Sequence, residues 1–173
     1  RPPTISDFYP RTLVISGLSK SMSMTGWRLG WMCGAEDVVR SALVLHGYVT
    51  TCASTISQKA ALAAWTDEAA TARHAARQVF HARRDHLLKL FDEHLGVRAV
   101  VPEGAFYVML PIENFGTSMD IAEAALERGV IIVPGSAFGS ESEGFLRVSF
   151  CAEEEVLSEG VRRLREALLR DEG

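Results

Sequence analysis

The sequence predicts an α/β protein, and three patterns support this prediction. Residues 12–15 form a short apolar run rich in β-branched residues, which is typical of a buried strand. Residues 27–33 and 145–150 each follow the two-residue alternation of a strand. Residues 67–95 instead repeat apolar side chains at the spacing of a helix. Because strands and helices follow one another along the chain, we expect sheets packed against helices.

The chemistry of the chain concentrates in residues 16–34, which read SGLSKSMSMTGWRLGWMCG. The alternation in 27–33 predicts that Arg28 and Gly30 share one strand face. A guanidinium beside a residue without a side chain suits a flat anion, because it holds a phosphate through two hydrogen bonds. Lys20 lies among hydroxyl residues, and a lysine that is partly desolvated near an arginine becomes a nucleophile for a carbonyl. The alternative is a solvated loop lysine.

The order Ser-Lys followed by Met-Thr-Gly-Trp-Arg-Leu-Gly-Trp resembles the cofactor-lysine segment of class I/II aminotransferases, which are fold type I enzymes that use pyridoxal 5′-phosphate. The resemblance implies that Lys20 forms a Schiff base with the cofactor and that Arg28 binds its phosphate. One residue departs from the family pattern, because Gly17 stands where many members have serine. The phosphate hydrogen bond of that serine is then missing or is supplied by another hydroxyl, for which Ser19 is the candidate.

Further elements of the first half follow from capping residues and apolar spacing. Glu36 and Asp37 supply negative charge where a helix begins, and Thr55 with Gln58 makes a capping box. The predicted elements are a helix over 36–47 with one apolar face, a loop over 48–54, a tightly packed buried helix over 60–65, and one helix over 67–95 with an apolar stripe from Ala69 to Phe91.

Shorter elements are predicted from Gly96 onward. Residues 102–104 are a turn signal between two strand-like runs, and Ser118 is the expected cap of a helix closed by Gly129. Residues 153–155 open a final helix. The predicted elements are strands over 97–101, 105–110, 130–133 and 145–150, a helix over 118–128, and a last helix that buries Leu157, Val161, Leu164 and Leu168 and carries Arg162, Arg163, Arg165 and Arg170 toward its end.

This change of pattern places a domain transition within or just before the long helix. The resemblance implies the C-terminal part of a fold type I transferase, namely the end of the large mixed-sheet α/β/α domain followed by the small α+β domain. We therefore expect residues 1–75 to end the large cofactor-binding domain, and residues 76–173 to hold the connecting helix and the small C-terminal domain. The start Arg1-Pro-Pro, without methionine, fits a fragment that covers less than half of a typical member.

Arg147 lies in the middle of the apolar strand 145–150. A guanidinium there needs an anionic partner, because an unpaired buried charge is strongly unfavourable. One interpretation is a structural ion pair with a glutamate. The other comes from the resemblance, which implies that Arg147 binds the α-carboxylate of the substrate through two hydrogen bonds, and we favour this role.

Histidines and cysteines do not predict a metal site. The four histidines of the long helix (His74, His81, His86 and His94) include no pair four residues apart, so a solvated helix face is preferred over a metal site. Cys33, Cys52 and Cys151 are widely spaced in apolar contexts, and we expect buried free thiols in a reducing compartment.

Composition limits the partners. The net charge of −4 without a basic block argues against nucleic acid as a partner. No apolar run approaches the roughly 20 residues that span a bilayer, and no signal peptide opens the chain, so we expect a cytoplasmic protein without membrane association. The resemblance adds a homodimer as the expected state of the full-length protein.

The resulting hypothesis is a pyridoxal-phosphate-dependent aminotransferase that moves an amino group between an amino acid and a 2-oxo acid through a Lys20 Schiff base. The alternatives are a carbon–sulfur lyase of the same fold and a non-catalytic regulatory module on this scaffold. The family residues that tune the cofactor ring find no match among these 173 residues. We therefore expect this chain alone to be weakly active or inactive.

Overall fold

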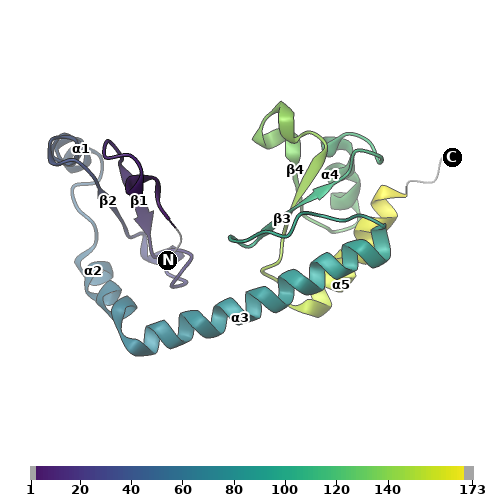
Figure 1. Cartoon of the computed structure of the whole chain (residues 1–173), viewed down its shortest axis with the longest axis horizontal. Helices are drawn as coiled ribbons and strands as arrows, with labels where there is room; N and C mark the ends of the chain where they lie inside the picture. The colour runs from purple at the N-terminus through teal and green to yellow at the C-terminus, as the bar shows by residue number, and fades with distance from the viewer. Residues whose placement is uncertain (1–2, 170–173) are drawn as a thin grey trace. The chain divides into compact units, whose positions relative to one another are not determined.

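The computed structural model describes residues 3–169, which form two compact units that divide between Ala75 and Ala76. The division falls inside the long helix α3, Asp67–Leu90 (Figure 1). Each unit has its own sheet and its own buried core. No helix of the described residues is both long and apolar enough to cross a membrane.

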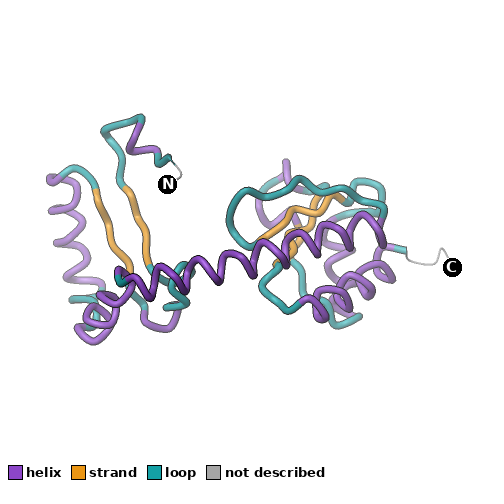
Figure 2. The backbone as a smooth tube through the Cα atoms, turned by 60° about the horizontal axis from the view of Figure 1, so that its bottom comes forward, coloured by secondary structure: helices purple, strands orange, loops and turns teal. Residues whose placement is uncertain are grey.

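The first unit is built on an antiparallel hairpin whose strands lie side by side in Figure 2. Its buried core is small and consists of Leu18, Met24, Ala61 and Ala64. Two of these side chains come from the loop between the strands, so the core holds that loop rather than the sheet. The elements are β1 (Val14–Gly17), β2 (Gly30–Cys33), α1 (Glu36–Val49) and α2 (Thr55–Ala61).

The predicted strand over 27–33 is shorter than its alternation indicates, because β2 begins only at Gly30. Residues Thr25–Trp27 form a 3-10 turn, closed by the Trp27 N–H donating to Met24 O at 3.1 Å. Arg28 follows with a left-handed backbone, φ 51° and ψ 46°. The prediction that Arg28 and Gly30 share a strand face is therefore wrong, since local turn hydrogen bonds take the place of the ladder.

The helices of the first unit begin where expected but differ in length and burial. Helix α1 continues through Tyr48 to Val49, and it buries no side chain completely, so its predicted apolar face is exposed in this chain. The cap of α2 is Ser54 rather than Thr55, because the Ser54 hydroxyl accepts the N–H of Ser57. The predicted buried helix over 60–65 becomes a 3-10 turn after Ala61, and of its residues only Ala61 and Ala64 are buried.

The second unit has a three-stranded antiparallel sheet in the order β3-β5-β4. The C-terminal part of α3 and helix α5 lie next to each other (Figure 1), and His86 Nε2 is 2.9 Å from Ser158 Oγ between them. Buried side chains from α3, β3, α4, β5 and α5 meet in one extensive core. The elements are β3 (Tyr107–Pro111), α4 (Ser118–Glu127), β4 (Val133–Pro134), β5 (Phe145–Ser149) and α5 (Glu154–Leu168).

Two predicted strands of this unit are wrong in whole or in part. Residues 97–101 are not a strand, although Val97 and Ala99 pack on the core, because the segment alternates its burial without pairing to a neighbour. The strand predicted over 130–133 is reduced to Val133–Pro134, and Ile131 before it is 86% exposed. The cap of α4 is Thr117 rather than Ser118, because the Thr117 hydroxyl accepts the Asp120 N–H.

The two longest helices confirm their predictions. The helix over 67–95 is continuous, with α3 passing into a π-helical turn at Phe91–Leu95, and it buries its stripe only toward the C-terminal end. Helix α5 buries the four predicted residues. Arg170, which was expected near its end, lies outside the described residues.

The three cysteines differ from the prediction, since Cys33, Cys52 and Cys151 are all free but exposed. Apolar sequence neighbours do not bury them, because Cys33 ends a strand of the small hairpin while Cys52 and Cys151 lie outside helices and strands.

Candidate active site

A close pair of glycines closes the hairpin loop that carries Lys20. Gly17 and Gly30 are register partners at the ends of β1 and β2. A Cβ added to Gly17 would lie 2.9 Å from Leu29 O, and one added to Gly30 would lie 2.8 Å from Ser16 O. The two backbones therefore approach more closely than any side chain permits. This contact gives a physical reason for the glycine at position 17, where the family pattern led us to expect serine.

Hydrogen bonds inside the loop connect its two charged residues through the backbone. The Thr25 hydroxyl donates to Ser19 O at 2.9 Å, and Arg28 Nη1 donates to Thr25 O at 3.1 Å. The buried Leu18 carbonyl accepts the N–H of Met24 at 3.4 Å. The segment that carries Arg28 is thus tied to the residue directly before Lys20.

Lys20 and Arg28 are both exposed, while Ser19 is half-buried. The described residues do not supply the desolvation expected at the Lys20 amine, because the small core of the first unit leaves Lys20 exposed. Neither Lys20 nor Arg28 forms an ion pair within residues 3–169. Their positions nevertheless agree with a shared site, since both belong to the one loop that Gly17 and Gly30 close.

Arg147 lies in the second unit, in the middle of β5, where it pairs with Met109 of β3 and Val133 of β4. Its Cζ lies 4.3 Å from the ring centroid of Tyr107 and 4.7 Å from that of Phe138. The two aromatic faces attract the cation and limit its movement. We call Tyr107 and Phe138 the aromatic clamp.

The buried Nε of Arg147 has no hydrogen-bond partner, and Arg147 forms no ion pair with any described residue. The interpretation as a structural ion pair with a glutamate is therefore wrong for the described chain. A buried N–H without a partner is costly, so a site that keeps one is expected to receive an acceptor from outside it.

Sequence reasoning missed the aromatic clamp, although one signal was present. Tyr107 stands opposite Ser149, so it lies near Arg147 on the same face of the sheet by alternation. Phe138 ends the 3-10 turn Gly135–Phe138, and its placement depends on the packing of that turn, which no periodicity reveals.

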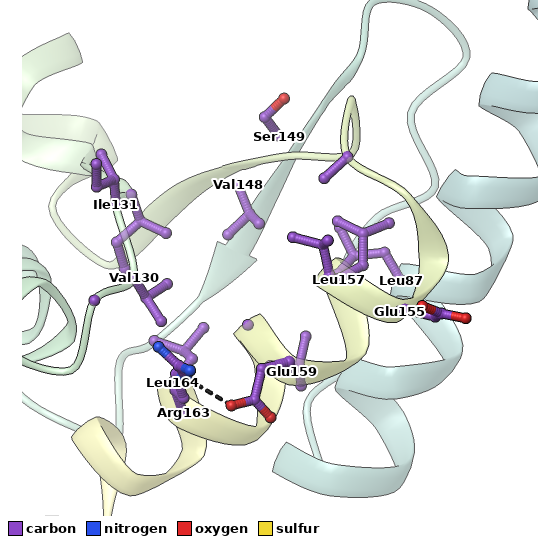
Figure 3. A pocket seen from close by; sticks show the side chains of 16 residues that line it. Leu87, Val130, Ile131, Val148, Ser149, Glu155, Leu157, Glu159, Arg163 and Leu164 are labelled. Atoms are coloured by element: carbon purple, nitrogen blue, oxygen red, sulfur yellow. Dashed lines mark hydrogen bonds and ion pairs between the residues drawn. The ribbon is translucent and has the colours of Figure 1, made fainter.

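A second feature of this unit is an apolar groove of about 490 Å³ between α5 and residues 129–132 (Figure 3). Leu87, Val148 and Leu164 are among the side chains that line it, as are Arg163 and Glu159, where Arg163 Nε donates to Glu159 Oε1 at 2.7 Å. None of the four predicted site residues lines it. The groove therefore contributes no chemistry to the candidate site.

The chain matches the family model for aminotransferase class I and II over residues 4–164. A probable N-acetyl-LL-diaminopimelate aminotransferase of Bacillus subtilis is 42% identical over an alignment of 165 positions that covers 92% of this chain and 41% of the relative. An aromatic-amino-acid aminotransferase of Thermococcus litoralis is 36% identical over 95% of this chain and 43% of the relative. The chain thus spans about two fifths of the length of these curated relatives.

Solved structures agree with the sequence relatives. An aromatic aminotransferase from Pyrococcus horikoshii matches with a TM-score of 0.87 and 34% identity, over 92% of this chain and 43% of the other. An aspartate aminotransferase from Thermus thermophilus, solved with maleate, also gives a TM-score of 0.87, over 95% of this chain and 43% of the other. The predicted fold is confirmed as part of fold type I. The chain belongs to the class I and II aminotransferase family.

Proposed function

We propose that the protein containing these residues is a pyridoxal-phosphate-dependent aminotransferase acting on an amino acid and a 2-oxo acid. The observation that carries the proposal is the Arg147 guanidinium, which the aromatic clamp holds and whose buried Nε has no partner. A substrate carboxylate would supply the missing acceptor, and Arg is suited to bind it through two hydrogen bonds.

The two units correspond, in this proposal, to two domains of the family. Residues 1–75 would be the C-terminal part of the large cofactor-binding domain, and residues 76–173 the connecting helix and the small C-terminal domain. The separate cores of the two units support this assignment.

The loop closed by Gly17 and Gly30 has the donor groups that pyridoxal phosphate requires. Lys20 offers an amine for the aldehyde, Arg28 a guanidinium for the phosphate, and Ser19 a hydroxyl that would replace the family serine. The hydrogen bonds from Thr25 and Arg28 keep this loop compact, so the residues present fit the cofactor. When bound, the cofactor ring takes up the negative charge that develops at the substrate Cα.

The chain's own residues would then divide the work. Lys20 Nζ would hold the cofactor and, once released, would act as the base that moves the Cα proton. Arg28 would bind the phosphate and fix the cofactor in position. Arg147 would hold the carboxylate at one end of the substrate and so orient the Cα–H bond for proton removal.

Two alternatives remain as outcomes of a test. The named relatives are all aminotransferases, which favours transamination over a carbon–sulfur lyase. Amino transfer that requires a 2-oxo acid would support the proposal, whereas release of pyruvate and ammonia would indicate the lyase. A protein that binds the cofactor at Lys20 without any turnover would be a regulatory module.

The decisive experiment locates the cofactor on the chain. The longest natural form of the protein that contains these residues is incubated with pyridoxal phosphate, reduced with borohydride and analysed by peptide mass spectrometry. The label is expected on Lys20 and is expected to disappear in Lys20→Ala. Lys59→Ala, which removes an exposed lysine of the same unit, is the control and should keep the label. A label that persists in Lys20→Ala would refute the assignment.

We further propose a homodimer in the cytoplasm, free of nucleic acid and membrane. The exposed apolar side chains of α1, including Leu43 and Val44 at 66% and 62% exposure, support an assembly that covers them. Light scattering on the same long form tests the dimer, and the 173-residue chain alone is expected to be weakly active or inactive.

A further inference from the structure

A buried polar cluster joins the start of α4 to the segment that follows β4. Ser118 is completely buried, and its N–H donates to Glu143 Oε1 at 2.7 Å. Its Oγ lies 3.1 Å from Glu143 Oε2 and 3.2 Å from the backbone N of Ser136. Both carboxylate oxygens of Glu143 are therefore engaged by one residue. Hydrogen bonds to an ionised group are stronger than neutral ones, and the N-terminus of a helix favours a negative charge.

Two residues of this cluster, Ser136 and Glu143, lie on either side of Phe138 in the chain. Ser136 lies within the turn Gly135–Phe138, and Glu143 lies directly after the next 3-10 turn, Ser140–Ser142. At its start this segment passes very close to its own end, because a Cβ added to Gly135 would lie only 1.8 Å from Ser142 O. The segment is thus fixed at both ends, and its shape determines where the Phe138 ring stands.

Phe138 itself has little packing of its own, since it is 48% exposed. Its contact with the Arg147 guanidinium therefore depends on the backbone that carries it. Tyr107 differs, because it lies within a paired strand. One half of the aromatic clamp is thus held by the sheet, and the other half by the Ser118–Glu143 cluster.

We infer that Glu143 is a positioning residue for carboxylate binding. By binding Ser118, it holds the Phe138 turn against Arg147. The inference rests on the proposed function, because it assumes that Arg147 receives the substrate carboxylate. Losing the charged hydrogen bonds would loosen the Phe138 side of the clamp and weaken the binding of carboxylates, but not of amines.

The test measures inhibition of the longest natural, cofactor-loaded form by paired probes. Maleate and 3-phenylpropionate carry carboxylates without an amino group, and 2-phenylethylamine carries an amine without a carboxylate. In Glu143→Ala, the inhibition constants of the two acids should rise about two- to fivefold, the scale of losing the Phe138 ring from the guanidinium, while that of the amine stays unchanged. Glu141→Ala removes an exposed glutamate of the same segment and should leave all three constants unchanged.

Glu143→Gln keeps an acceptor for the Ser118 N–H and should give a smaller rise, and it replaces Glu143→Ala if that variant does not fold. Equal weakening of acids and amine, or no difference from Glu141→Ala, would overturn the inference. Arg147→Ala distinguishes failure of the proposed function from failure of the inference about Glu143. If it leaves acid binding intact, the proposed role of Arg147 fails. If it abolishes acid binding while Glu143 variants do not affect it, only the inference about Glu143 fails.

Discussion

The hairpin loop of the first unit and the Arg147 site of the second are organised by different means. Lys20 and Arg28 are exposed side chains on a loop that backbone hydrogen bonds and two glycines hold together. Arg147 is held by rings and by a strand paired on both sides, above an extensive core. Arg147, the proposed carboxylate-binding group, is therefore held in place by contacts within its own unit. Lys20 and Arg28, in contrast, lie on a loop that its own hydrogen bonds hold together, and both side chains are exposed.

The largest expected effect concerns the loop. Lys20→Ala should lower kcat by about 10⁴-fold, because the proposed base of the proton transfer is lost. The measurement is transamination by the longest natural form, with Lys59→Ala as the matched lysine control. A near-normal kcat in Lys20→Ala would refute the proposed role of Lys20 as the base.

The next effect concerns the difference between the two cores. Leu110 is completely buried in the second unit, so Leu110→Ala should lower the free energy of unfolding by about 2–5 kcal/mol. Leu18→Ala, in the small core of the first unit, should cost less, because only three other buried side chains, Met24, Ala61 and Ala64, surround it. Urea unfolding of the 173-residue chain measures both. Equal losses would show that the two units do not differ in core quality.

The third effect separates charge from geometry at Arg147. Arg147→Lys keeps the cation but loses the planar fork, so KM for the amino acid should rise about 10- to 100-fold. Arg128→Lys is the control, because the Arg128 side chain donates to a backbone carbonyl of its own helix, Ala124 O. An unchanged KM in Arg147→Lys would mean that a point charge is sufficient.

A smaller effect is expected from the clamp. Phe138→Leu keeps an apolar side chain but removes the ring face, which is worth about 0.5–1 kcal/mol at an exposed site. KM for the amino acid should rise about two- to fivefold, with kcat little changed. Phe115→Leu, at the edge of the second unit's core, is the control and should leave KM unchanged. A fall in kcat without a change in KM would contradict a clamp role.

The smallest effect concerns Glu159 on α5, which belongs to neither site. Hydrogen bonds from Arg162 and Arg163 lower the pKa of Glu159 from 4.5 to about 2. A carboxylate with a lowered pKa stabilises the fold above its unfolded pKa, and this contribution is lost as the pH falls from about 4.5 through 2. The stability difference between wild type and Glu159→Gln should therefore shrink over that range in urea titrations. A stability difference between the two proteins that grows on acidification would contradict this prediction.

Periodicity in the sequence predicted those parts of the fold in which a regular element meets a core. The buried positions of α5 and the alternation around Arg147 are examples. It failed where local hydrogen bonds decide, as at the turn before Arg28 and at the caps Ser54 and Thr117. Residues 97–101 show a third case, since alternation indicates one-sided burial but does not create a pairing partner.

The candidate site also has a part that the sequence predicted and a part that it did not. Lys20, Arg28 and Arg147 were found from residue type and order, and their roles remain predictions. The loop's closure by Gly17 and Gly30 and the packing of Phe138 on Arg147 required coordinates, because both depend on the path of a loop or turn, which no periodicity in the sequence reveals. Exposure of Lys20 also could not be foreseen, since burial depends on what surrounds the loop.

The close pairing of Gly17 and Gly30 limits which amino acids these two positions can accept. Any residue with a side chain at either position would force the strand ends apart and displace everything between them. A saturation library selected for activity should therefore lose almost every substitution at 30 and, at 17, every substitution larger than the serine of the family pattern. Gly26, which has open space around its Cβ position, should tolerate alanine in the same library.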